Sequence, residues 1–154
     1  MTVTAPTPRA PAPARRPPVA ARRVGYLIAA GINVVLLYLV NISPGWEAVP
    51  FLTEDTRQVL GLANLSLVAG LVCNLVYVLV DPTWLKSLGD LLTTGIGLAV
   101  LVRLWQVFPF DFGDSAADWA LVVRAVLVVG VIGSAIGIVV QLVSLVRAVR
   151  AACS

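Results

Sequence analysis

A chain of 154 residues has the length of one domain, but its composition is not that of a soluble one. Hydrophobic residues make up 59% and charged residues only 12%, whereas a soluble domain carries about 25% charged residues. With a mean hydropathy of +0.94 and a formal net charge of +3, the chain has more apolar surface than so small a globule can bury. This excludes a soluble domain and indicates an integral membrane protein.

The chain begins with a proline- and arginine-rich tail over residues 1–23. More than half of the ten prolines lie there, together with five arginines and no acidic residue. Such a segment cannot bury enough apolar surface to offset its ordering entropy, so we expect it to be disordered. It either anchors the topology of the first helix or is attracted to anionic lipid headgroups. Without aromatic residues and beside a membrane, it is not expected to bind nucleic acid.

Four apolar runs follow the tail, and each is long enough to cross a bilayer as a helix. Their approximate ranges are 24–43, 58–80, 88–107 and 119–146. A membrane barrel would need alternating strands of about 10 residues, and these runs do not alternate. The sequence therefore predicts an all-α, polytopic membrane protein, with a four-helix transmembrane bundle over residues 24–154 and no room for a separate soluble module.

The basic residues lie on one side of this predicted topology. The N-terminal tail, the 81–87 turn and the C-terminus hold Arg9, Arg15, Arg16, Arg22, Arg23, Lys86, Arg147 and Arg150. The other two connections hold only Arg57. By the positive-inside rule both termini are expected in the cytoplasm. The excess of arginine over lysine and the abundance of alanine, glycine, proline and valine favour a bacterial plasma membrane.

Each apolar run has one face of small or polar residues at helical spacing. These faces include Asn33, Asn74, Asp90, Thr94, Gly130, Gly133, Ser134, Gly137 and Gln141. One interpretation is helix packing, for which the small residues of the fourth run, with a GxxxG from Gly133 to Gly137, are suited. The other is a hydrated ion or solute path past Asn33, Asn74, Asp90, Thr94 and Gln141.

The charged and aromatic residues near the ends of the apolar runs each have two interpretations. Arg103 and Arg124 lie just below the outer face, with Arg57 nearby; they either snorkel to headgroups or clamp an anionic lipid. Asp90 forms an ion pair with Lys86 one turn earlier, or binds a proton or cation with Thr94. The aromatic rings at the outer rim anchor the helices at the interface, or form a surface for a partner.

The residues that most enzymes need are missing. The chain has no histidine, and its two cysteines, Cys73 and Cys153, lie far apart along the predicted topology. No zinc, haem or iron–sulfur spacing, P-loop or GxSxG is present. Asp90 is the one acidic residue within the runs, so no carboxylate pair is available. We therefore expect a protein that is not an enzyme and that has no metal site and no cofactor.

Three functions remain open. The first is a non-catalytic accessory, scaffold or assembly subunit that contacts another membrane protein, or a second copy of itself, through helix faces. The second is a small oligomeric transporter or channel. The third is binding of an anionic lipid at Arg57, Arg103 and Arg124.

Overall fold

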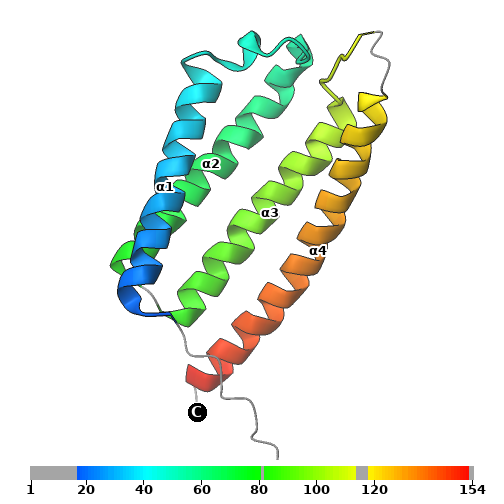
Figure 1. Ribbon diagram of the computed structural model, residues 1–154. Helices are drawn as coiled ribbons and strands as arrows, with labels where there is room; N and C mark the ends of the chain where they lie inside the picture. The colour runs from blue at the N-terminus through cyan, green and yellow to red at the C-terminus, as the bar shows by residue number, and fades with distance from the viewer. Residues whose placement is uncertain (1–16, 81, 114–117, 153–154) are drawn as a thin grey trace, which may run out of the picture.

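The computed structural model describes residues 17–80, 82–113 and 118–152, and it is all-helical. Two short 3₁₀ helices, η1 (Trp46–Ala48) and η2 (Glu54–Thr56), lie in the first connection. The four long helices are α1 (Val19–Asn41), α2 (Arg57–Leu79), α3 (Thr83–Val107) and α4 (Trp119–Ala152) (Figure 1). All four are long and apolar enough to cross a membrane. The predicted all-α class and the four spanning-length helices are confirmed.

The helices pack in chain order, α1 on α2, α2 on α3 and α3 on α4 (Figure 1). Within the described part of the chain, α1 and α4 do not pack extensively against each other. The arrangement is therefore an open row of antiparallel hairpins. Few apolar side chains are buried; they include Ala30, Val59, Tyr77 and Leu127.

The start of α1 and the end of α4 lie at the same end of the row, which we call the inner end (Figure 1). The outer end is formed by residues 42–56 and 108–113, which lie between helices. The 34 residues of α4 rise about 51 Å, against a hydrocarbon core of about 30 Å. As Figure 1 shows, the excess length of α4 projects past α3 at the inner end.

Prolines explain why two helices start earlier than predicted. Proline has no N–H to donate and a fixed φ, so a helix can begin directly after it. α1 begins after Pro18, which is extended at φ −57° and ψ 149°, and residues 19–23 are helical although they were predicted as part of the tail. Likewise α3 begins at Thr83, after Pro82. Residues 1–16 of the predicted tail lie outside the described residues.

The ends of α3 and α4 are set by local conformation. α3 ends where Phe108 adopts the left-handed conformation, with φ 43° and ψ 63°. α4 is capped by Asp118, whose Oδ1 accepts a hydrogen bond of 3.0 Å from the Leu121 backbone N–H. α4 also continues past the predicted end at Val146, since alanine and arginine are strong helix formers.

Candidate functional site

The polar residues between α1 and α2 form two contacts. Near the outer end, the amides of Asn41 and Asn64 bond reciprocally, at 2.9 Å and 2.7 Å. Deeper in the row, Asn33 packs against Gly70, where a Cβ atom would lie 2.9 Å from Asn33 Oδ1. Asn74 donates to the backbone carbonyl of Gly70 at 2.7 Å, so Asn33 and Asn74 converge on one glycine.

A second polar contact joins α2 to α3 at the inner end, and we call it the inner polar cluster: Tyr26, Tyr77, Lys86, Gly89 and Asp90. The Tyr77 hydroxyl donates to the Lys86 backbone carbonyl at 3.0 Å and lies 3.4 Å from Asp90 Oδ1. Lys86 Nζ is 2.5 Å from Asp90 Oδ2. The Tyr26 ring of α1 packs edge-on against Tyr77, which is only 4% exposed. The cluster therefore joins residues of α1, α2 and α3.

The contact between α3 and α4 contains small residues and one amide. Gln141 Nε2 donates to Thr94 Oγ1 at 2.9 Å, while Gln141 Oε1 is buried with no partner among the described residues. A Cβ atom on Gly130 would lie 3.2 Å from Leu101, and one on Gly137 would lie 3.8 Å from Thr94. Gly130 and Gly137 therefore let α3 approach closely.

Gly133 and Ser134 differ from these two glycines in their surroundings. Gly133 is exposed, and no atom outside its own helix lies within 4 Å of its Cβ position. Ser134 is half-buried. The GxxxG of α4 thus has one glycine in the contact with α3 and one on an open face.

The five residues suggested for an ion or solute path are distributed over three helix contacts. Asn33 of α1 lies against Gly70 of α2, Asn74 bonds to Gly70 within α2, Thr94 and Gln141 lie at the α3–α4 contact, and Asp90 lies in the inner polar cluster. The amide nitrogens of all three amides donate to groups of the same chain. Gln141 and Thr94 therefore join α4 to α3, and Asp90 contacts Tyr77 of α2, whereas the amides of Asn33 and Asn74 donate within their own helices.

The three arginines suggested for an anion site contact different partners. Arg57 pairs with Glu54 at 3.2 Å and Glu47 at 3.6 Å. Arg103 donates to Gln58 Oε1 of α2 at 3.4 Å. The Arg124 guanidinium lies over the Phe108 ring, 4.7 Å from its centre. Each guanidinium therefore has its own partner.

The outer end contains a pairing between its two loops, which we call the loop clasp. The Thr53 N–H donates to the Pro109 carbonyl at 3.0 Å, and the Asp111 N–H donates to the Phe51 carbonyl at 2.9 Å. Leu52 and Phe110 form an isolated antiparallel bridge between these bonds. The side chain of Pro109, whose carbonyl takes part in the clasp, is almost fully buried.

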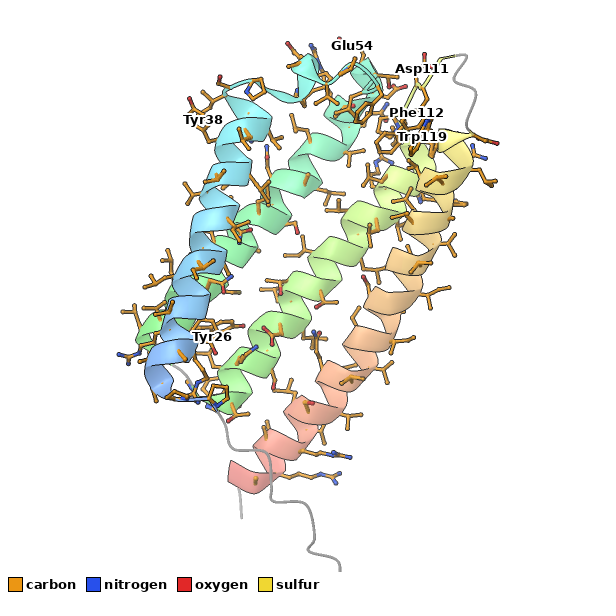
Figure 2. The ribbon with its side chains drawn as sticks, in the orientation of Figure 1. Tyr26, Tyr38, Glu54, Asp111, Phe112 and Trp119 are labelled. Carbon is orange, nitrogen blue, oxygen red and sulfur yellow. The ribbon has the colours of Figure 1, made fainter. Side chains whose placement is uncertain are left out.

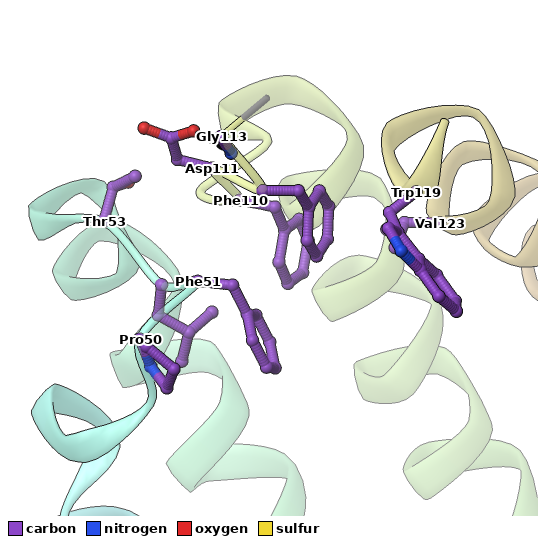
Figure 3. Close-up of a pocket in the computed structure, with 10 residues that line it drawn as sticks. Pro50, Phe51, Thr53, Phe110, Asp111, Gly113, Trp119 and Val123 are labelled. Carbon is purple, nitrogen blue, oxygen red and sulfur yellow. Dashed lines mark hydrogen bonds between the residues drawn. The ribbon is translucent and has the colours of Figure 1, made fainter. Parts of the chain in front are cut away.

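A pocket of about 940 Å³ opens beside the loop clasp, and we call it the outer pocket. Its walls come from the two loops and the first turns of α4 (Figure 3). The lining residues are Pro50, Phe51, Leu52, Thr53, Phe110, Asp111, Phe112, Gly113, Trp119 and Val123. The Phe51 and Phe112 rings stack with centres 5.6 Å apart, as do those of Phe110 and Phe112 at 6.1 Å.

The polar groups of the outer pocket are few. Asp111 is the one charged residue among the described residues that line it, and Asp111 Oδ1 accepts a hydrogen bond of 2.9 Å from the Gly113 N–H. Thr53 Oγ1 is buried and has no partner among the described residues. Figure 3 shows the Asp111 carboxylate at the outward edge and the aromatic rings pointing toward the helices.

Two functional positions were missed by the sequence prediction. Asn64 could have been found as an amide near the outer end of the second run, level with Asn41 of the first. Gly89 carried no such signal, because its importance comes from Tyr77 of the neighbouring helix. Within the described residues, no group of three or more cysteine, aspartate or glutamate side chains is placed to hold a metal ion.

Comparison of the chain with protein-family models, curated proteins and solved structures returns no match.

Proposed function

We propose that this chain is a non-catalytic membrane protein that serves as an accessory, scaffold or assembly subunit. It acts by packing its helix faces against another membrane protein or a second copy of itself. The observation that carries the proposal is the open row, in which α1 and α4 each pack against one neighbour in the described part of the chain. Most of the circumference of both terminal helices is therefore available for contact.

Glycines on the open faces support this proposal. Gly25 and Gly31 of α1, Gly61 of α2 and Gly133 of α4 are exposed, and a Cβ at each would meet open space. Glycine lowers helix stability by about 1 kcal/mol relative to alanine, and in membranes it is enriched where two helix backbones approach closely. Within the row no other helix backbone approaches these glycines. A helix of a second molecule could therefore pack closely against them.

The polar groups between the helices support a packing role as well. The Asn41–Asn64 pair, the Gln141–Thr94 bond and the bond from the Tyr77 hydroxyl to the Lys86 carbonyl each join two helices of the same chain. Interhelical bonds of this kind stabilise membrane helix contacts by about 0.6 to 2 kcal/mol each.

The test is native mass spectrometry of the protein extracted gently from its own membrane, on the wild type and on Gly31→Leu and Gly133→Leu. Each leucine fills open space, so the monomer should fold normally while the fraction of protein in complexes falls at least about fivefold for one of the two variants. Ala135→Leu is the matched control, since it makes a similar volume increase on the opposite side of α4. A wild-type protein without a stoichiometric protein partner or homo-oligomer would overturn the proposal, as would complexes that tolerate both variants.

A further inference from the structure

The outer pocket has a combination of groups that the packing role of the helices does not use. Four aromatic rings, from Phe51, Phe110, Phe112 and Trp119, form much of its wall, and one carboxylate lies at its edge. No lysine or arginine is among its lining residues. The pocket is also at the helix ends, where a spanning helix meets water and headgroups (Figure 2).

This combination selects for positive charge next to an apolar body. The face of an aromatic ring is negative, and it attracts ammonium groups that lie within about 6 Å of the ring centre. Asp111 adds a formal negative charge at the outward edge. An anionic group would be repelled by Asp111 and would find no cation among the lining residues.

The outer end already shows that its aromatic rings accept cations. Arg124 lies over Phe108, with Cζ 4.7 Å from the ring centre, and Arg57 lies over Trp46 at 5.8 Å. The Phe108 ring is in edge-to-face contact with Phe110, which lines the pocket. The pocket rings have the same chemistry, but no cationic residue lines the space that they enclose.

We propose that the outer pocket binds a small cationic amphiphile of the alkylammonium class. Its ammonium group lies at the outward edge beside Asp111, within reach of an outer face of the Phe51–Phe112–Phe110 stack, and its apolar chain lies against Trp119 and the other apolar lining residues. This inference is independent of the proposed role in assembly.

The experiment titrates the purified full-length protein in dodecyl maltoside micelles with three ligands of equal chain length. These are hexyltrimethylammonium, hexanesulfonate and 1-hexanol. Binding to the wild type is measured by isothermal titration calorimetry. It is also measured by fluorescence of a Trp46→Phe/Trp84→Phe/Trp105→Phe variant, in which Trp119 is the one remaining tryptophan. We expect saturable binding of the ammonium compound, at least about fivefold tighter than that of 1-hexanol, and no saturable binding of the sulfonate.

Two aspartate variants separate the pocket from general surface charge. In Asp111→Asn the amide oxygen can still accept the Gly113 hydrogen bond, so the loop is retained while the charge is lost. We expect its affinity for hexyltrimethylammonium to fall about threefold to tenfold. Asp55→Asn removes the same charge from the same end of the row outside the pocket, and it should bind as the wild type does.

Three results would overturn the proposal. Equal losses in Asp111→Asn and Asp55→Asn would show attraction to the surface potential alone. Binding of 1-hexanol as tight as that of the ammonium compound would show a purely apolar pocket. A wild-type protein that binds none of the three ligands saturably would show that the pocket is not a binding site for this class.

Discussion

A Cβ atom on Gly89 would overlap the Tyr77 hydroxyl oxygen and lie 2.9 Å from Tyr77 Cζ. The ring cannot withdraw freely, because its hydroxyl donates to the Lys86 carbonyl and its edge packs against Tyr26. Tyr77 is also among the few side chains that the row buries. The close approach of α2 and α3 at the inner end therefore depends on the absence of a side chain at position 89.

Replacement of Gly89 by alanine should destabilise the protein by about 1–3 kcal/mol, because the inserted methyl group displaces Tyr77 and breaks its hydrogen bond. The free energy of unfolding can be measured by titration with sodium dodecyl sulfate in dodecyl maltoside micelles. Gly97→Ala is the control on the same helix, since nothing lies within 4 Å of its Cβ position. Its stability should be unchanged or slightly higher; equal losses in both variants would contradict the prediction.

At the scale of the elements, α3 and α4 meet through one side-chain hydrogen bond whose amide is only half satisfied. Gln141 Nε2 donates to Thr94, while Gln141 Oε1 is buried without a partner in the described residues. A buried polar group that loses its partner is destabilising, whereas replacement of both partners by apolar groups is often nearly neutral. The losses of stability caused by replacing Thr94 and by replacing Gln141 with apolar residues should therefore not be additive.

We expect Thr94→Val to lower the free energy of unfolding by about 0.5–1.5 kcal/mol, because it leaves the whole Gln141 amide unpaired. Adding Gln141→Leu should recover most of that loss. Thr93→Val is the matched control, since Thr93 Oγ1 bonds only to the carbonyls of Gly89 and Asp90 in its own helix. Its loss should be smaller than that of Thr94→Val. Strict additivity in the double variant would argue against a direct bond between α3 and α4.

At the scale of the whole molecule, four antiparallel helices place both described ends of the chain at the inner end (Figure 1). Five of the eight basic side chains in the described part of the chain lie there too, namely Arg22, Arg23, Lys86, Arg147 and Arg150. The opposite end holds Glu47, Glu54, Asp55, Asp111 and Asp118. This charge distribution underlies the prediction that the inner end faces the cytoplasm.

Labelling of single cysteines tests this orientation. In a Cys73→Ala/Cys153→Ser background, Val19→Cys and Val149→Cys should react with a membrane-impermeant maleimide only after the cells are permeabilised. Ala48→Cys, in η1 at the outer end, should react in intact cells. The three native positions are exposed. Reaction of positions 19 and 149 from different sides would contradict the even number of crossings, and reversal of all three would contradict the orientation.

Much of the fold could be predicted from hydropathy, because spanning helices are set by the length of an apolar run. The helix starts were predicted less well. The third apolar run begins at Leu88, whereas α3 begins at Thr83, directly after Pro82 and before Lys86. For the same reason, residues 19–23 belong to α1 and not to the tail.

The contacts between helices could be predicted only in part. A polar face on each helix was visible at helical spacing, but not which neighbour it meets, since that depends on the order and rotation of the helices. The aromatic rim was visible as well. The outer pocket was not, because its walls are brought together by backbone hydrogen bonds between Phe51 and Asp111 and between Thr53 and Pro109.

The loop clasp also has a consequence for biogenesis. One loop segment of the clasp precedes α2 and the other follows α3. Synthesis of the first helical hairpin, α1 and α2, therefore supplies only one of the two segments of the clasp. The remaining walls of the outer pocket, Trp119 and Val123, belong to α4. The pocket therefore comes into existence only when the last helix has been delivered and docked on α3. A ligand that occupies it would bind the finished protein and not a chain whose synthesis is incomplete, so occupancy would mark completed folding.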